Sequence, residues 1–201
     1  MNNTLDKDIL LLDLKEFGVD SGDTLFLRGD LGSVGKIRGN TFIQALVDAV
    51  GPTGTVVTLG FTKSYPFHKV NKDYIFHKYT KPETGALGKL FIKNNSCYRS
   101  SHPTNSFLAI GKNAELITKA HSEKSTSYYP IKHLINLKAK MLIFGIIDSS
   151  PGFTTVHYAQ EQLGLTKKNI MCGKYKVYFK NNEKIELFVK NDIGGCSKGF
   201  S

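Results

Sequence analysis

The sequence predicts an α/β protein, because apolar patterns of strand type and of helix type alternate along its 201 residues. A buried strand expected at 24–27 opens into a glycine-containing loop, which leads into a helix and then into a second strand at 55–59. Further helices and strands follow, and a chain of this length with 40% hydrophobic residues can bury a sizeable core. We therefore expect residues 1–201 to form a single domain.

The helices of the first half are delimited by their flanking residues. Residues 4–17 carry apolar side chains at helical spacing and stop before Gly18, which predicts an amphipathic helix followed by a left-handed residue. A second helix is expected at about 40–50, with Asn40 as its N-cap.

The loop GDLGSVGKIRG precedes that second helix and has the composition of an anion-binding turn. Its glycines, with Lys36 and Arg38, offer backbone N–H groups and positive charge. It is not a Walker loop, because Asp30 stands where a glycine is needed and Ile37 where a hydroxyl residue is needed. The loop chemistry alone leaves a functional and a purely structural role equally open.

The middle of the chain combines regular elements with one long irregular segment. Residues 61–82 contain many aromatic residues, but their apolar residues follow neither a helix nor a strand periodicity. A connection of this length is usually functional or disordered. Further elements are expected as a helix at 85–93, a strand at 106–110, a helix at 113–119, a strand at 140–146, and a hairpin of GKYKVYFK and EKIELFVK.

A helix containing FTTVHYAQE follows the strand at 140–146. Ser150 is its expected N-cap, and Gly164 its stop. On a helical projection, an arc formed by Phe153, Val156, Gln160 and Leu163 is expected to face the core, and His157 lies at the edge of this arc. A histidine so placed suits proton transfer, while a lone helical histidine is more often structural. A role of His157 as a metal ligand is less strongly indicated, because the helix lacks a second histidine four residues further on.

The segment RSSHPTNS, residues 99–106, places a cation, an imidazole and several hydroxyl groups beside an expected strand. Pro103 favours an extended conformation at His102. So many hydrogen-bond donors suit an anionic or amide-rich ligand, although an ordinary polar loop would look the same.

Composition narrows the class of partners. The formal net charge is +10, almost all from lysine, and such a field attracts anions. Scattered lysines and only three arginines argue against nucleic acid as a partner. The longest apolar runs are too short to cross a membrane. Three widely spaced cysteines form neither a zinc site nor a disulfide framework, so we expect a cytoplasmic protein.

Four motifs in this order make the chain resemble the aminoglycoside 3-N-acetyltransferase family, also called the antibiotic N-acetyltransferase family. They are LGSVGKIRGN, YRSSHPTNSFLAIGKNAELI, AKMLIFGIIDSSPGFTTVHYAQE and GGCSKGF. The resemblance implies a three-layer α/β/α sandwich with a central mixed sheet, to which the C-terminal β-hairpin is added. Members generally continue for some tens of residues after GGCSKGF, so the resemblance implies a chain that is either truncated at its C-terminus or unusually short.

The resemblance also implies an activity, namely transfer of acetyl from acetyl-CoA to an amine of an amino sugar. The acceptor would be an aminoglycoside antibiotic, in antibiotic resistance, or a surface-polysaccharide precursor. His157 corresponds to the family's general base, and Glu161 is the expected carboxylate beside it, although family members usually carry glutamate where this chain has Gln160. Asp73 and His77 of the long loop are expected to contact the acceptor. Contacts to CoA are expected from Ser33, Val34, Gly35, Lys36, Arg99, Ser101, His102, Ser106 and Phe107.

Two alternative functions stay open at this point. One is a CoA-binding relative impaired in catalysis, favoured by Gln160 and the early C-terminus. The other is a basic nucleic-acid-binding module. A homodimer is compatible with the sequence, and neither a metal nor a membrane partner is expected.

Overall fold

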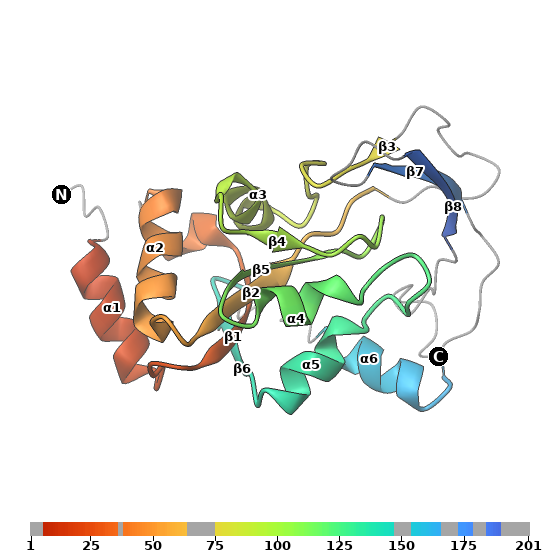
Figure 1. Ribbon diagram of the computed structural model, residues 1–201. Helices are drawn as coiled ribbons and strands as arrows, with labels where there is room; N and C mark the ends of the chain where they lie inside the picture. Colours follow the sequence, from red (N-terminus) through yellow and green to blue (C-terminus); the bar gives the residue numbers. More distant parts are fainter. Residues whose placement is uncertain are drawn as a thin grey trace.

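The computed structural model describes residues 6–35, 38–63, 75–146 and 154–165, together with the backbone of two later strands at 173–178 and 184–189. A mixed five-stranded sheet forms its centre, in the order β4-β5-β2-β1-β6 (Figure 1). The strands are β1 (Thr24–Gly29), β2 (Thr55–Leu59), β4 (Tyr98–Arg99), β5 (Phe107–Gly111) and β6 (Lys140–Phe144). β1 pairs in parallel with β2 and β6, whereas β5 is antiparallel to β2 and β4.

Helices cover both faces of this sheet. One face packs against α1 (Lys7–Glu16), α2 (Gly39–Val50) and α3 (Ala86–Lys93), and the opposite face against α4 (Ala114–Lys119) and α5 (Pro130–Asn136). Alternate residues of a strand therefore enter different cores: Leu25 and Leu27 join the first, and Phe26 joins the second. α6 (Thr155–Gln162) lies on the side of α4 and α5 (Figure 1). The predicted three-layer α/β/α sandwich is confirmed.

A second, three-stranded sheet has the order β3-β7-β8. β7 (Gly173–Tyr178) and β8 (Lys184–Val189) form the antiparallel hairpin that the sequence predicts. β3 (Ile75–Phe76) belongs to the long segment after β2 and pairs in parallel with β7. The C-terminal hairpin is thereby joined to the segment expected to contact a ligand.

Most predicted helices are observed, with corrections at their starts. Gly18 and Gly164 both have positive φ, 77° and 67°, as expected of helix stops. The predicted N-cap Asn40 is wrong: α2 already begins at Gly39, after Arg38 in the cap position. α6 begins at Thr155, later than expected, and the predicted cap Ser150 lies outside the described residues. α5 was not predicted.

The strand directions bring the predicted site segments to one edge of the sheet. Because β1, β2 and β6 are parallel, their carboxyl ends share an edge, and the chain leaves it at Asp30, Gly60 and Gly145. Arg99 at the end of β4 and Phe107 at the start of β5 lie at this same edge. In open α/β sheets, this carboxyl edge is where ligands bind.

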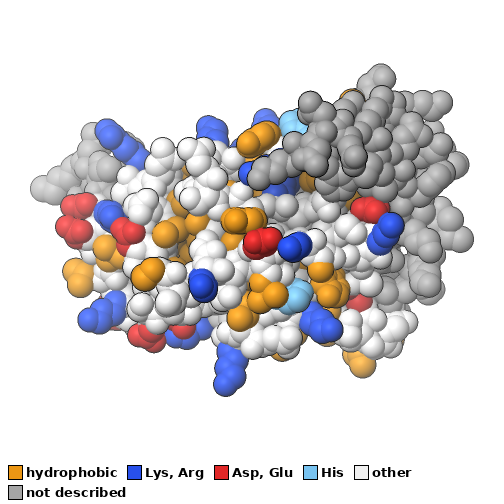
Figure 2. All heavy atoms as spheres, in the orientation of Figure 1, with side chains coloured by type: hydrophobic (Ala, Val, Ile, Leu, Met, Phe, Trp, Pro, Cys, Tyr) orange, Lys and Arg blue, Asp and Glu red, His pale blue; other side chains and the backbone are white. Residues whose placement is uncertain are grey.

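The cationic side chains on the face seen in Figure 2 are dispersed and do not form one continuous patch. Lysine and arginine side chains are spread across that face, with acidic side chains between them. Within the described ranges, no helix has the length and apolar character needed to cross a membrane.

Candidate active site

His157 lies half-buried in the first turn of α6, at the carboxyl edge of the sheet. Its Nδ1 atom lies 3.1 Å from the side-chain oxygen Oε1 of Gln160, one helical turn further on. This contact orients the imidazole ring from within the helix.

Tyr128 contacts the same imidazole from outside the helix. The ring centroids of Tyr128 and His157 are 5.1 Å apart, with an interplanar angle of 31°. Tyr128 is buried in the second core, just before α5. Burial raises the pKa of the Tyr128 phenol, the Glu161 carboxylate raises it further, and Arg28 opposes both. The phenol therefore keeps its proton and holds the His157 ring as a neutral neighbour.

Arg28 joins β1 to the start of α6. Its Nη1 donates a hydrogen bond of 2.9 Å to Oγ1 of the buried Thr154, the residue before α6. Burial lowers the pKa of the Arg28 guanidinium from its ordinary value, an effect that Tyr128 partly offsets. Arginine is still charged at neutral pH, so this is a charge-assisted hydrogen bond, which is stronger than a neutral one.

The face of α6 that packs inward differs from the predicted one. Val156 and Leu163 of the predicted apolar arc are 47% and 71% exposed. Thr154 is buried, and His157 and Tyr158 are half-buried, with Tyr158 packed against the second core. The helix is therefore anchored by polar and aromatic side chains, and the prediction for its apolar face is wrong.

Glu161, the predicted carboxylate partner, does not occupy the Nδ1 position of His157. That position belongs to Gln160. The carboxylate oxygens of Glu161 are buried, and their charge acts on Tyr128. The cluster of Arg28, Tyr128, His157, Gln160 and Glu161, here called the His157 cluster, places a single imidazole among a cation, a carboxylate and two neutral polar groups.

The segment 99–107 serves mainly as internal structure. Arg99 donates from Nε to Ser106 Oγ at 3.0 Å and from Nη2 to the carbonyl of Gly60 at 2.8 Å. It also donates from Nη1 to the carbonyls of Lys78 and Thr80. The guanidinium thus joins the end of β2 to residues 78–80, contrary to the expectation that it is displayed to a cofactor.

Most other residues of this segment that were predicted to contact CoA are buried. Ser106 and Phe107 are fully buried, and Ser106 Oγ donates to the carbonyl of Gly60 at 2.6 Å. Their side chains are therefore not available for direct contact with CoA. Ser101 is half-buried, and its Oγ donates to the carbonyl of His121 at 3.3 Å.

His102 is buried with a second histidine. Its ring stacks on that of His121 at 4.8 Å between centroids, and its Nδ1 accepts a hydrogen bond from the Asn105 N–H at 3.0 Å. Burial lowers the pKa of His102 to about 3. Burial and the neighbouring His102 lower the pKa of His121 well below its ordinary value. Both imidazoles are neutral at neutral pH, and the expected contact of the His102 side chain with CoA is not supported.

The loop after β1 is exposed but less rich in free donors than its sequence suggests. Oδ1 of Asp30 accepts the Gly32 N–H at 3.0 Å, and the Asp30 carbonyl accepts the Ser33 N–H at 3.2 Å. Ser33 and Gly35 are exposed and Val34 is half-buried. Lys36, predicted with them, lies outside the described residues.

The remaining predicted residues lie apart from the His157 cluster or outside the described ranges. His77 is exposed, and its Nδ1 accepts the Tyr79 N–H at 3.2 Å. Asp73 lies outside the described residues. Burial raises the pKa of the Cys97 thiol to about 12, which makes it a poor nucleophile. Among the described side chains, no group of three or more His, Cys, Asp and Glu residues could hold a metal ion.

Comparison with known proteins identifies the family. Residues 27–195 match the model of a family described as aminoglycoside 3-N-acetyltransferase. The chain belongs to this family. An aminoglycoside N(3)-acetyltransferase III from Salmonella sp is 27% identical over 188 residues, which cover 85% of this chain and 65% of that protein.

A second relative extends the comparison. The aminoglycoside N(3')-acetyltransferase-like protein YokD of Bacillus subtilis, derived from the SPbeta prophage, is 28% identical over 179 residues, or 76% of this chain and 64% of YokD. This chain thus spans less than two thirds of the length of these relatives.

Solved structures show the same fold. AAC-IIIb in a binary complex with CoASH gives a TM-score of 0.76 at 22% identity, with 92% of this chain and 76% of the other covered. AAC-VIa bound to sisomicin gives a TM-score of 0.75 at 22% identity, with 93% and 75% covered.

The sequence did not lead us to expect Arg28 and Tyr128 in the His157 cluster. Arg28 follows a buried strand, and the carboxyl end of a parallel strand is a position at which functional side chains are expected. Tyr128 had a weaker signal, since Pro130 marks the start of the short helix α5. Its contact with His157 joins residues far apart in the sequence and could not be anticipated locally.

Proposed function

We propose that this protein transfers the acetyl group of acetyl-CoA to an amine of an amino sugar, with His157 as the general base. The proposal draws on membership of the aminoglycoside 3-N-acetyltransferase family and on the geometry of the His157 cluster. It assigns the reaction to the carboxyl edge of the sheet and, from the sparse cysteines, to the cytoplasm.

The observation that carries the proposal is the contact between His157 Nδ1 and Gln160 Oε1. An amide oxygen accepts a hydrogen bond, so Nδ1 bears the ring proton when the imidazole is neutral. The lone pair then lies on Nε2, which can accept a proton. The half-buried position of the ring provides both this fixed orientation and access to a substrate.

The chemistry requires one proton acceptor and no metal. The amine nitrogen bonds to the thioester carbonyl carbon, and the bond from that carbon to sulfur breaks, so that the electron pair leaves with sulfur. The proton lost by the amine passes to Nε2 of His157 and from there to the sulfur of the leaving thiolate. A positioned base of this kind contributes roughly 10²- to 10⁴-fold to the rate.

Acetyl-CoA fits the exposed part of the loop after β1 better than segment 99–107. Ser33 and Gly35 are exposed, whereas Ser106, Phe107 and the His102 ring are buried. We therefore assign CoA contacts to residues 33–35 and to the half-buried Ser101. The acceptor is assigned to the amino sugars, because relatives are named for aminoglycosides and AAC-VIa binds sisomicin.

The proposal is tested by following free thiol in mixtures of the purified protein, acetyl-CoA and one amine at a time. The amines are sisomicin, glucosamine and a nucleotide-linked amino sugar. We expect thiol release that depends on both protein and amine, together with an acetylated amine detected by mass spectrometry. Absence of amine-dependent release with all three amines would contradict the proposed activity.

A further inference from the structure

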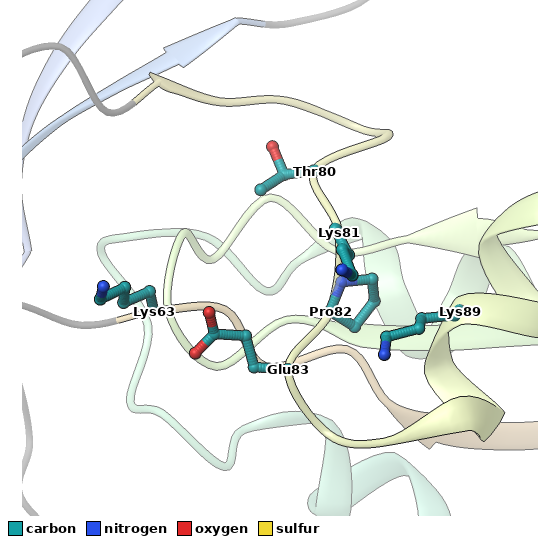
Figure 3. A pocket seen from close by; sticks show the side chains of 6 residues that line it. All are labelled: Lys63, Thr80, Lys81, Pro82, Glu83 and Lys89. Carbon is teal, nitrogen blue, oxygen red and sulfur yellow. The ribbon is translucent and has the colours of Figure 1, made fainter.

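An open pocket at the carboxyl edge of the sheet is not part of the His157 cluster. It has a volume of about 410 Å³ and is lined by Lys63, Thr80, Lys81, Pro82, Glu83 and Lys89 (Figure 3). This volume is within the range of small-molecule sites. Lys63 follows β2, Lys89 belongs to α3, and the segment between Thr80 and Glu83 forms the third wall.

The walls of the pocket are fixed by hydrogen bonds and close packing. The Glu83 N–H donates to the carbonyl of Phe61 at 2.7 Å, and Thr84 Oγ1 donates to the carbonyl of Leu59 at 2.7 Å. Arg99 donates to the carbonyl of Thr80. A Cβ added at Gly88 would lie 3.0 Å from both Pro82 and the Leu59 carbonyl, so α3 packs closely against this wall. These contacts fix the backbone of the pocket walls.

The lining carries an excess of positive charge. Three lysines and one glutamate line it, and Figure 3 shows the amino groups of Lys81 and Lys89 on the side of Pro82, with Lys63 on the other side of Glu83. Among the described residues, neither Lys81 nor Lys89 takes part in an ion pair. Ammonium groups are compact point charges that bind phosphate oxygens well and repel cations.

A short chain of ring contacts connects this pocket to His157. The Phe61 carbonyl holds Glu83 at the pocket, while the Phe61 ring lies 6.1 Å from the ring of Tyr128. Tyr128 in turn lies 5.1 Å from His157. The pocket wall and the His157 cluster are thus linked through two aromatic side chains of the second core.

We infer that the lysine pocket binds a phosphate or diphosphate group of a substrate of the acetyl transfer. This inference rests on the proposed function. The group belongs either to a phosphorylated or nucleotide-linked amino-sugar acceptor or to CoA. If the group belongs to the acceptor, the pocket narrows the acceptor class towards anionic amino sugars, because its lysines repel a polycationic amine.

Direct binding of inorganic pyrophosphate tests the pocket independently of any activity. Isothermal titration compares the wild type with the Lys81→Gln/Lys89→Gln variant and with Lys112→Gln/Lys132→Gln, which removes the same charge from exposed lysines elsewhere. We expect the pocket variant to raise the Kd roughly five- to thirtyfold and the control to leave it within about twofold. Equal Kd values in both variants, or no saturable binding to the wild type, would overturn the inference.

Two further titrations identify the source of the phosphate. If it belongs to CoA, the pocket variant raises the Kd of CoA, and pyrophosphate competes with CoA. If it belongs to the acceptor, the Kd of CoA is unchanged, and the KM rises for a nucleotide-linked amino sugar but not for glucosamine. A role of the pocket in substrate binding is overturned if the pocket variant changes neither the Kd of CoA nor the KM of the nucleotide-linked amino sugar. Absence of all turnover in the wild type would contradict the proposed activity, while the pyrophosphate titration would still test the pocket.

Discussion

His102 and His157 are both histidines of conspicuous polar motifs near one edge of the sheet, yet their surroundings are opposite. His102 is 1% exposed, stacks on His121, and receives the backbone N–H of Asn105. His157 is half-buried, and its Nδ1 meets the side chain of Gln160. A fully buried imidazole stabilises a loop, whereas a half-buried imidazole with one nitrogen in a hydrogen bond is suited to exchange protons.

Replacing the buried histidine is expected to give the largest loss of stability. His102→Ala leaves a cavity beside His121 and leaves the Asn105 N–H without its partner. We expect the free energy of unfolding to fall by about 2–4 kcal/mol, as measured by urea denaturation. His77→Ala, at an exposed position, serves as the control and should change it by less than about 0.5 kcal/mol. Equal stability of the two variants would contradict the structural role of His102.

The buried histidine pair should also make the protein sensitive to acid. Burial lowers the pKa of His102 to about 3, compared with 6.5 for an unperturbed histidine. Between about pH 3 and pH 6.5 the unfolded state binds more protons than the folded state. The contribution of this histidine to the free energy of unfolding is therefore fully present above pH 6.5 and is lost as the pH falls below it.

This acid sensitivity can be measured between pH 6.5 and 4.5. As the pH is lowered, the free energy of unfolding should decrease with a limiting slope of about 1.4 kcal/mol per pH unit for each buried histidine. The slope should be smaller in His102→Gln, which lacks one titrating group. A wild-type stability that stays constant over this interval would contradict neutral burial of the pair.

A smaller and more specific effect is expected at the link between β1 and α6. Arg28→Met removes the hydrogen bond to Thr154, so the first turn of α6 and the His157 ring lose a fixed position. We expect kcat to fall roughly tenfold, with partial recovery in Arg28→Lys. Lys112→Met removes a charge at an exposed position and should leave kcat unchanged. An unaltered kcat in Arg28→Met would remove Arg28 from the positioning residues.

The smallest expected effect concerns the partner of His157. Gln160→Glu replaces the amide with a carboxylate, which favours the protonated form of the imidazole. The acidic limb of the pH profile of kcat/KM should therefore move to higher pH by roughly one unit. Gln162→Glu makes the same charge change at an exposed position of α6 and should leave the profile in place. A profile equally displaced in both variants would point to overall charge instead of a direct contact.

The sequence was sufficient for the elements whose signals are local. Gly18 and Gly164 mark helix stops, and the alternating residues of β7 and β8 mark a hairpin. Each signal lies within the element that it defines, so no distant contact was needed. The N-cap of α2 was misplaced by two residues, since Asn40 is a good capping residue but Arg38 occupies the cap position.

The sequence was insufficient wherever burial depends on distant residues. Ser106 looked like a donor for a ligand, but its partners are Gly60 and Arg99, which the pairing of β5 with β2 and β4 brings next to it. The inward face of α6 was misjudged in the same way. Its position depends on Arg28 and Tyr128, which no periodicity within the helix reveals.

The central claim, that His157 is the base of an acetyl transfer, is tested most directly by comparing His157→Ala with His133→Ala. His133 is also a half-buried helical histidine beside a tyrosine ring, at 5.4 Å from Tyr129, but it lies outside the His157 cluster. With acetyl-CoA and an accepted amine, we predict that kcat falls roughly 10²- to 10⁴-fold in His157→Ala, while the thermal midpoint of unfolding stays close to that of the wild type. His133→Ala should retain its rate. Full thiol release by a folded His157→Ala protein would contradict the claim.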